Sequence, residues 1–334
     1  MKALLLHHQA PIEEHPLVLE DWPIPKPQDD EILLKVDFCA ICRTDLHIIE
    51  GDLALQRTPL IPGHQAIGTV VQLGSKCKSV SVGMTVGVAW LGSTCKTCEY
   101  CEAGKENLCV EPRFTGYHFQ GGYAEYMTAK EDYVYVLPAS TNKAQTTPLL
   151  CAGIIGYRAL VRSGFSPGKH LGIFGFGSSA HVIAQLAIAQ KARLSVVTRS
   201  TAHQNLAKDL GAQWVSDSTQ GLPDLLDSAI LFAPAGDLVP VALESLKRGG
   251  TLAVAGIHLS PIPLLDYEKH LFFEKDLRSV TANTRQDGQE LLKAAHEVRI
   301  HPQTTIYEFE KANEALQDLK HDLILGTAVL KISK

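Results

Sequence analysis

Hydrophobic and polar positions divide the chain into two parts with different periodicity. Up to about residue 138, short runs rich in β-branched and aromatic residues alternate with loops that contain Gly and Pro. This pattern is typical of β-strands. From about residue 144, apolar runs alternate with stretches of helical periodicity. The second pattern predicts βαβ units and a parallel sheet, so we expect a mainly β domain followed by an α/β domain.

Individual elements follow from the same runs. In the first part, strands are expected over residues 31–37, 67–73, 85–90, 123–128 and 133–137. In the second part, strands are expected over residues 171–174, 194–197, 229–232, 251–255 and 279–282, with helices between them. The tail has helices at 286–297 and 311–319 and a last strand at 327–332. The expected domains are 1–150, 151–285 and a return to the first domain over 286–334.

Length, composition and charge narrow the class of protein. A chain of 334 residues is long enough for two domains. It is 45% hydrophobic and 20% charged, its net charge is −5, and it has no basic block that would indicate a nucleic-acid partner. No apolar run approaches the roughly 18 residues that span a bilayer, and the N-terminus lacks the features of a signal peptide. We therefore expect a cytoplasmic protein without a nucleic-acid or membrane partner.

Four of the eight cysteines lie within fifteen residues. They are Cys95, Cys98, Cys101 and Cys109. This spacing is typical of a closed tetrahedral zinc site, which has a structural role, and an iron-sulfur cluster is the alternative. In a long chain without an export signal, the pattern favours metal over disulfides.

A dinucleotide-binding loop is predicted after the strand at residues 171–174. The sequence continues as Gly175-Phe176-Gly177-Ser178-Ser179-Ala180 and then with helical periodicity. Glycines at these positions let backbone N–H groups approach a pyrophosphate at a helix N-terminus. The next strand ends in Thr198, Arg199 and Ser200, without the acidic residue that usually binds the ribose of NAD. Because Arg199 can pair with a 2′-phosphate, we expect NADP(H) to be preferred over NAD(H).

A second metal site can be assembled from the remaining Cys and His residues. A catalytic zinc needs three protein ligands and one open position. Cys42, His64 and Cys151 are the best candidates, the last at the join between the two expected domains. A metal held there would face the cofactor.

Together these motifs make the chain resemble the zinc-dependent alcohol dehydrogenases of the medium-chain dehydrogenase/reductase family. The resemblance covers nearly the whole chain and implies a GroES-like β domain plus a doubly wound Rossmann domain. It implies that Cys42, His64 and Cys151 bind catalytic zinc and that the four clustered cysteines bind structural zinc. It also implies a homodimer or homotetramer.

The resemblance assigns roles to the segment CAICRTDLH. Arg43 would reach the cofactor pyrophosphate, and Thr44 would contact the alcohol. Asp45 would support His64, and His47 would pass the proton outward. Trp90, Tyr117 and His118 are candidates for the substrate pocket, where aromatic walls favour primary alcohols and their aldehydes. Cys39 and Cys77 have no role in this scheme and are expected to be packed or surface thiols, with a reactive Cys39 as the alternative.

The sequence departs from the family pattern at two positions near the predicted catalytic site, and three other functions are alternatives to an alcohol dehydrogenase. The usual Glu after the ligand His is Gln65, and a common Thr is Ile155; we expect catalysis to survive both changes. Polyol dehydrogenases of the same family typically have Glu as the third ligand, where this chain has Cys151. Quinone reductases of this fold lack zinc, and a zinc-ribbon binding module would not need the nucleotide loop.

Overall fold

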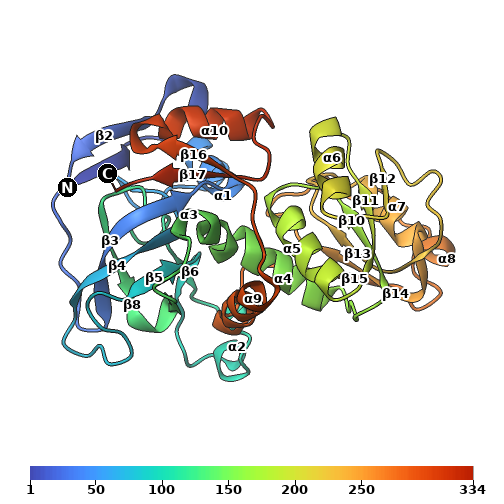
Figure 1. Cartoon of the computed structure of the whole chain (residues 1–334), viewed down its shortest axis with the longest axis horizontal. Helices are drawn as coiled ribbons and strands as arrows, with labels where there is room; N and C mark the ends of the chain where they lie inside the picture. The colour runs from blue at the N-terminus through green and yellow to red at the C-terminus, as the bar shows by residue number, and fades with distance from the viewer. Residues whose placement is uncertain (334) are drawn as a thin grey trace. The chain divides into compact units, whose positions relative to one another are not determined.

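The chain folds into two compact units (Figure 1). The computed structural model describes residues 1–333. Unit 1 contains Met1–Cys151, Ala282–Gln289 and the segment from Pro302 onward. Unit 2 contains Ala152–Thr281 and Glu290–His301. The chain therefore leaves unit 1 and returns to it twice.

Unit 1 is built on a seven-stranded sheet in the order β16-β17-β3-β4-β5-β9, with β8 also paired to β3. The strands are β3 (Glu31–Ala40), β4 (Gln65–Leu73), β5 (Thr85–Val88), β8 (Tyr126–Lys130), β9 (Val134–Leu137), β16 (Thr304–Glu308) and β17 (Thr327–Lys331). β17 pairs antiparallel with β3, so the last strand is next to one of the first. The tail therefore supplies two strands, β16 and β17, to the sheet of unit 1.

Smaller elements complete unit 1. Two hairpin-like pairs join β1 (Lys2–Leu6) to β2 (Leu17–Asp21) and β6 (Leu91–Ser93) to β7 (Arg113–Phe114). The helices are α1 (Arg43–Glu50), α2 (Glu99–Glu102), α3 (Lys143–Thr146) and α10 (Ala312–Lys320).

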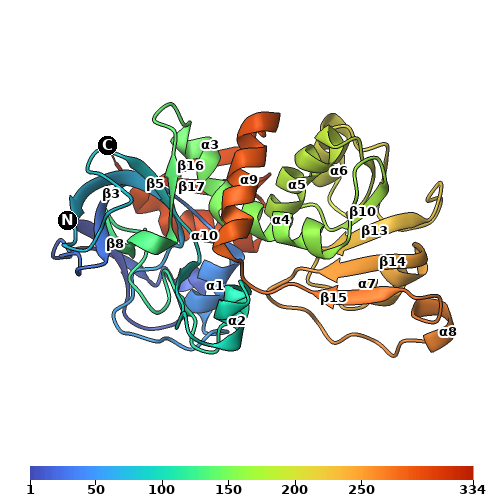
Figure 2. The same cartoon turned by 90° about the horizontal axis from the view of Figure 1, so that it is seen from below.

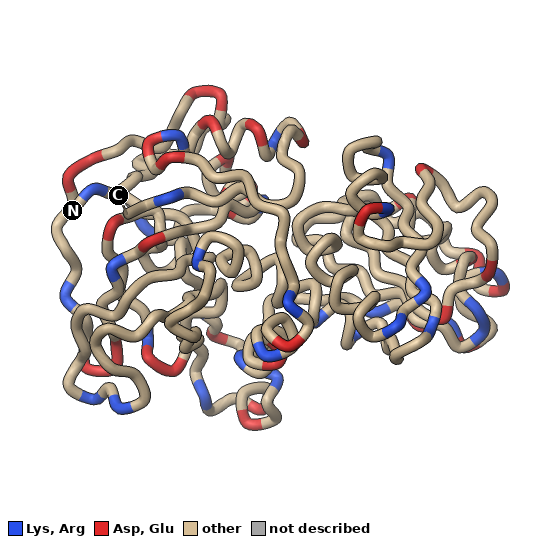
Figure 3. The backbone as a smooth tube through the Cα atoms, viewed as in Figure 1, with Lys and Arg blue, Asp and Glu red and all other residues tan. Residues whose placement is uncertain are grey.

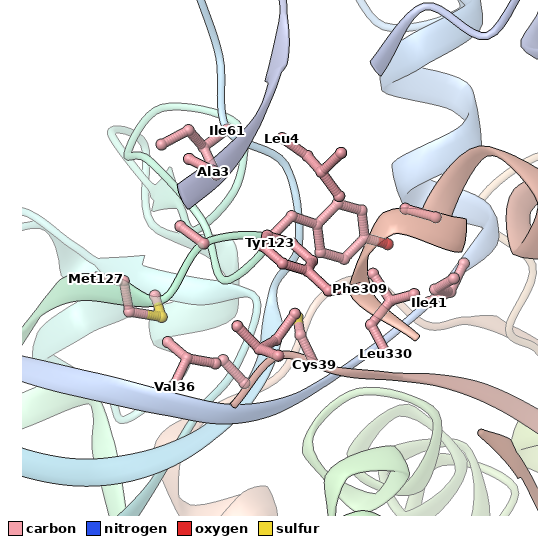
Figure 4. Packing of buried hydrophobic residues seen from close by; sticks show 14 of the residues in the cluster. Ala3, Leu4, Val36, Cys39, Ile41, Ile61, Tyr123, Met127, Phe309 and Leu330 are labelled. Atoms are coloured by element: carbon pink, nitrogen blue, oxygen red, sulfur yellow. The ribbon is translucent and has the colours of Figure 1, made fainter. Parts of the chain in front are cut away.

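The core of unit 1 joins residues from its first and last strands (Figure 4). Tyr123 is fully buried among Leu4, Cys39, Phe309 and Leu330. Burying each large apolar side chain of this kind contributes about 1.5–3 kcal/mol. The N-terminal strand and the returning tail therefore stabilise the same core.

Unit 2 is a six-stranded parallel sheet in the order β12-β11-β10-β13-β14-β15. Its strands are β10 (His170–Phe174), β11 (Arg193–Val197), β12 (Trp214–Ser216), β13 (Leu226–Leu231), β14 (Leu246–Val254) and β15 (Asp276–Ser279). Counted from β10 in chain order, this is the 3-2-1-4-5-6 order of the dinucleotide-binding fold. Every residue of β10 is buried, as expected for a central parallel strand covered on both faces.

Helices flank the sheet of unit 2, as seen in Figure 2. They are α4 (Ala152–Arg162), α5 (Ser178–Ala189), α6 (Thr201–Asp209), α7 (Leu238–Glu244) and α8 (Tyr267–His270). Helix α9 (Arg285–Val298) begins in a segment of unit 1 and ends in one of unit 2. The predicted fold class, a GroES-like β domain plus a doubly wound parallel sheet, is confirmed.

Two expected strands are shifted along the chain. The strand expected at 123–128 is β8, Tyr126–Lys130, because residues 123–125 hydrogen-bond to β1 instead: Leu4 N–H donates to Tyr123 O at 2.9 Å. The strand expected at 279–282 is β15, Asp276–Ser279. Residue 282 lies outside the strand, since Ala282 has a φ of 46°, which is incompatible with an extended chain.

The surface of each unit carries both signs of charge. Lys and Arg are interspersed with Asp and Glu along the chain (Figure 3). Within residues 1–333, no helix has the length and apolar character needed to cross a membrane.

Candidate functional site

The segment that follows β3 begins helix α1. Cys42 is the N-cap residue in an extended conformation, and its N–H donates to Asp45 Oδ2 at 2.9 Å. The side chain of Thr44, in the first turn, is buried with Oγ1 3.6 Å from Cys42 Sγ. This helix is absent from the elements predicted above, although an acidic residue three positions after the N-cap is a known capping signal.

Cys42, His64 and Cys151 come together inside unit 1, and we call them the mixed cluster. Their sulfur and nitrogen atoms all lie within 4.8 Å of one another. His64 Nε2 is 3.3 Å from Cys151 Sγ. Each comes from a separate segment: the start of α1, the residue before β4, and the residue after a short 3₁₀ helix at Thr147–Leu150. The fold therefore brings together three residues that are far apart in sequence.

Asp45 and Tyr123 fix the imidazole of the mixed cluster. His64 Nδ1 is 3.0 Å from Asp45 Oδ1, and the Tyr123 hydroxyl donates to Asp45 Oδ2 at 3.2 Å. His64, Asp45 and Tyr123 are all fully buried. The contact with Asp45 leaves Nε2 of His64 directed to the two sulfur atoms. Asp45 was predicted from the family resemblance; Tyr123 was not, because no local pattern indicates a contact with a residue 78 positions away.

The electrostatic environment of the mixed cluster stabilises a cation placed among its three side chains. The Cys151 thiol and the His64 imidazole hold the pKa of Cys42 well below its usual range. Burial opposes protonation of His64, but the Asp45 carboxylate and Cys42 raise the pKa of His64 to about 10. The hydrogen bond from Cys151 to Cys42, together with burial, raises the pKa of Cys151 well above its usual range.

This donor set fits a zinc ion. Two thiolates and one imidazole are ligands that zinc prefers, and three protein ligands leave one position for substrate or water. The carboxylate contact on the other imidazole nitrogen is typical of metal-bound histidine.

The four cysteines of the second cluster, which we call the four-thiol cluster, also converge. The sulfur atoms of Cys95, Cys98, Cys101 and Cys109 lie within 4.8 Å of one another. Backbone N–H groups point at these sulfurs; Cys95 N–H donates to Cys109 Sγ at 3.3 Å. Backbone N–H groups of Thr97 and Cys98 lower the pKa of Cys95 to about 6. Four such donors fit a closed tetrahedral zinc site.

The four-thiol cluster contains no disulfide, and neither does the rest of residues 1–333, where all eight cysteines are thiols. Cys39 is fully buried in the core of unit 1, and burial raises its pKa well above the usual range. Cys77 is half-buried and donates to Glu31 O at 3.3 Å. A packed Cys39 fits this environment better than a reactive one.

An aromatic wall lies against the mixed cluster. The Trp90 ring contacts His64 edge-on at a centroid distance of 5.0 Å. Tyr117 stacks on Trp90 at 6.0 Å and contacts His118 at 4.7 Å. Phe114, which the sequence analysis missed, stacks on Trp90 at 4.6 Å. The three predicted pocket residues are therefore neighbours in one wall that reaches the cluster.

In unit 2, the Gly-rich turn lies between β10 and α5. Gly175 has a φ of 87°, and a Cβ there would approach Ala233 N within 2.7 Å, so only glycine fits. Gly177 is the N-cap residue of α5, and a Cβ on it would meet no protein atom within 4 Å. The first turn of α5 holds Ser178, Ser179 and Ala180. Open space in front of a helix N-terminus fits a pyrophosphate.

The residues after β11 complete the nucleotide side of unit 2. Thr198 is buried and its backbone is tied to Ser216 and Gln204. Arg199 and Ser200 are exposed. A fixed backbone with an exposed guanidinium at this strand end fits a phosphate on the ribose.

Four other residues singled out from the sequence lie in or near the first unit's polar contacts or in helix α4, and each has its own environment. The Arg43 guanidinium pairs with the Asp322 carboxylate within unit 1. His47 Nδ1 is 2.7 Å from Asp52 Oδ2. Gln65 is buried, and within residues 1–333 its Oε1 has no hydrogen-bond partner. Ile155 lies in α4 and is half-buried.

Comparisons with known proteins agree with this geometry. Residues 28–139 match the alcohol dehydrogenase GroES-like domain. The chain is 45% identical to a probable alcohol dehydrogenase, AdhA, of Mycobacterium tuberculosis, over 99% of this chain and 97% of that protein. It is 36% identical to an alcohol dehydrogenase of Geobacillus stearothermophilus, over 95% of this chain and 96% of that protein.

A solved structure of an alcohol dehydrogenase is also similar to this chain. A cinnamyl alcohol dehydrogenase from Sorghum bicolor superimposes with a TM-score of 0.89 at 27% identity, over 99% of this chain and 97% of that one. With the sheet order of unit 2 and the match over unit 1, this places the chain among the alcohol dehydrogenases of the medium-chain dehydrogenase/reductase family.

Proposed function

We propose that this alcohol dehydrogenase is zinc-dependent and transfers a hydride between a primary alcohol, or its aldehyde, and NADP(H). The observation that carries the proposal is the convergence of Cys42, His64 and Cys151 with their donor atoms within 4.8 Å. Such a set would hold one zinc, and the four-thiol cluster would hold a second. Zinc would act as a Lewis acid that lowers the pKa of a hydroxyl and polarises a carbonyl. The nicotinamide would carry the redox step.

The residues around the mixed cluster would orient the substrate and move its proton. Asp45 and Tyr123 hold the His64 ring in place through the contacts at 3.0 and 3.2 Å. Thr44 Oγ1, 3.6 Å from Cys42 Sγ, would accept the substrate hydroxyl proton while it passes its own proton through the cofactor ribose to His47. His47, oriented by Asp52, would exchange that proton with solvent.

The aromatic wall supports a substrate with an apolar body. Tyr117 and Phe114 each stack on Trp90, which contacts His64, and His118 contacts the Tyr117 ring. Burial, together with the positive charge of Arg113, lowers the pKa of His118, so its ring is neutral near pH 7. A neutral aromatic surface favours aliphatic or benzylic primary alcohols over polyols. This arrangement and a thiol as third donor favour our proposal over a polyol dehydrogenase.

NADP(H) would be held by unit 2. Gly175, Gly177 and residues 178–180 would cradle the pyrophosphate, while Thr198, Arg199 and Ser200 would bind the 2′-phosphate. Arg43, which the family resemblance assigns to the cofactor pyrophosphate, pairs with Asp322 within unit 1. A thiol-rich enzyme of this kind needs a reducing compartment, which supports a cytoplasmic location. We also propose a homo-oligomer.

A substrate panel tests this function. Primary alcohols, secondary alcohols, polyols and the matching aldehydes are assayed with NADP(H) and with NAD(H). We expect kcat/KM to be highest for apolar primary alcohols or their aldehydes with NADP(H). The variant Arg199→Asp should shift the preference toward NAD(H) by more than about tenfold, because it replaces the 2′-phosphate partner with a repelling carboxylate.

One control variant and two contrary results complete the test of cofactor and substrate. Lys208→Asp, a matched charge change on an exposed residue of unit 2, should leave the cofactor ratio unchanged. A wild-type enzyme with the higher kcat/KM for NADH would refute the cofactor assignment. Polyols turned over faster than apolar alcohols would refute the substrate class.

A further inference from the structure

Unit 1 contains a cavity that the proposed reaction does not use, and we call it the basic cavity. Its volume is about 360 Å³, a size typical of small-molecule sites. Its walls include Trp22, Lys26, Arg57, Arg113, Phe119 and Tyr126. No residue of the mixed cluster or the four-thiol cluster is among its described lining residues. The basic cavity is therefore a separate site in the same unit.

Uncompensated positive charge is the main feature of the basic cavity. Four basic side chains line it, and of these Lys130 pairs with Asp30 at 2.6 Å. Within the described residues, Lys26, Arg57 and Arg113 have no carboxylate at ion-pair distance. Glu31 is the single carboxylate among the described lining residues, and its Oε2 accepts the Gln28 N–H at 3.0 Å. The cavity therefore has excess positive charge although the whole chain has a net charge of −5.

The two arginines come from different segments, and one is held in position. The Arg113 guanidinium lies over the Phe119 ring at 5.0 Å from its centroid. Arg57 Nη1 makes a long contact of 3.4 Å with His118 O. Neither contact uses the full set of guanidinium donors, which can bind a carboxylate or phosphate in a bidentate manner.

Hydrogen bonds hold Gln120, another residue of the cavity wall. Gln120 Oε1 accepts the Ile61 N–H at 2.6 Å, and its Nε2 donates to Pro59 O at 3.1 Å. Trp22, Phe119 and Tyr126 add flat apolar surface to the same cavity. Rings of this kind stack on planar ligands and on delocalised cations.

We propose that the basic cavity binds a small organic anion with a flat apolar body, such as an aryl phosphate or aryl carboxylate. Arg57 and Arg113 bind the anionic group, with Lys26 adding charge. The aromatic side chains contact the flat body. The excess of uncompensated cations beside aromatic walls is what selects this class over a neutral ligand or a simple inorganic anion.

The position of the basic cavity connects it to the aromatic wall at the mixed cluster. The segment 113–120, which begins in strand β7, gives Arg113 and Phe119 to the cavity and Tyr117 and His118 to the wall. A second segment crosses between them: Gln56 Nε2 donates to the Tyr117 hydroxyl at 3.1 Å, and Arg57 contacts His118 O. A ligand that engages Arg57 and Arg113 therefore holds both segments. If the proposed function holds, occupancy changes KM for the alcohol.

Calorimetry on the full-length, zinc-loaded enzyme tests the proposal. The probe is phenyl phosphate, titrated in the presence of saturating NADP+ so that the phosphate sites of the cofactor are filled. We expect one phenyl phosphate per chain. Inorganic phosphate should bind about tenfold more weakly or worse, and phenol should not bind. Arg113→Gln and Arg57→Gln should each weaken binding by about tenfold or more.

Matched variants separate local from general effects. Arg299→Gln, at an exposed arginine of unit 2, should bind phenyl phosphate like the wild type. Lys26→Gln gives a second cavity variant in case Arg113→Gln lowers Tm. In turnover assays, phenyl phosphate should change KM for the alcohol by about twofold or more, and Arg113→Gln should abolish this change.

Several results would overturn the proposal: no saturable binding, unchanged binding in the arginine variants, or inorganic phosphate binding as tightly as phenyl phosphate. A changed oligomeric state of Arg113→Gln without ligand would identify the cavity as a contact face between copies and would also overturn it. Binding without alcohol turnover would refute the proposed function and not the cavity. Normal alcohol turnover without binding of phenyl phosphate would refute the cavity proposal and not the proposed function.

Discussion

At the residue scale, the hydroxyl of Tyr123 explains how the imidazole of the mixed cluster is fixed. The Asp45 carboxylate receives the Tyr123 hydroxyl on one oxygen and faces His64 Nδ1 with the other, and all three side chains are buried. Gly63, directly before His64, has a φ of 92°, and a Cβ there would meet the Tyr123 ring within 2.7 Å. The glycine therefore permits the close packing of this tyrosine.

Removal of one hydroxyl tests this chain of contacts. Tyr123→Phe should leave a buried carboxylate with one partner fewer, at a cost of about 1–3 kcal/mol. We expect zinc affinity at the mixed cluster to fall about tenfold or more, as measured by competition with a chelator. Zinc bound to the four-thiol cluster should be unaffected.

A second buried tyrosine provides the control for Tyr123→Phe. Tyr135 is also buried in unit 1, and its hydroxyl hydrogen-bonds to Asn283. Tyr135→Phe should keep wild-type zinc affinity at the mixed cluster. Equal affinity in Tyr123→Phe and the wild type would mean that Asp45 needs no support from the tyrosine.

At the element scale, the loop that carries the four-thiol cluster is also tied to the start of helix α9, in the segment Ala282–Gln289 of unit 1. Glu106, within this loop, is buried and accepts hydrogen bonds from Arg285 N at 2.6 Å and Nε at 3.0 Å. Arg285 also lies over the Tyr133 ring at 4.9 Å. A closed zinc site in the loop would therefore stabilise contacts beyond its own ligands.

Loss of one thiol in this loop should reduce stability more than activity. Cys98→Ser is expected to contain one zinc per chain fewer than the wild type. A loss of about 2 kcal/mol would lower Tm by about 4–8 °C. Metal analysis and thermal unfolding measure both effects, and kcat of the remaining folded enzyme should stay near the wild-type value.

Cys77→Ser is the matched control, since Cys77 is a half-buried thiol outside both clusters. It should keep the zinc content and Tm of the wild type. A Cys98→Ser variant with unchanged Tm and zinc content would contradict the proposal that the four-thiol cluster holds a structural zinc.

Elements differ in how far the sequence predicts them. The four-thiol loop and the turn from β10 to α5 are local, because their spacing and glycines require particular backbone geometry within a few residues. Helix α1 was missed since it has only eight residues, and its start depends on the cap formed by Cys42 and Asp45. Tyr123 and Phe114 were missed because their partners lie far along the chain, and β-pairing over such distances has no local signal.

At the scale of the whole molecule, the N-terminal and C-terminal segments support one site. Strand β17 pairs with β3, which leads directly to Cys42, and Phe309 and Leu330 pack against the core that contains Tyr123 (Figure 4). The tail is thus part of the unit that carries the mixed cluster. Chain length and the change in periodicity predicted two domains, and sheet order identified their class, but the contribution of the tail to this core required the structure.

The central claim is that alcohol turnover depends on a zinc ion held by Cys42, His64 and Cys151. Anomalous diffraction at the zinc edge, with activity measured on the same preparation, tests it most directly. The account predicts two zinc peaks per chain, one within each cluster. It also predicts that Cys151→Ser loses the peak at the mixed cluster together with activity. A fully active enzyme without zinc at the mixed cluster would contradict the account.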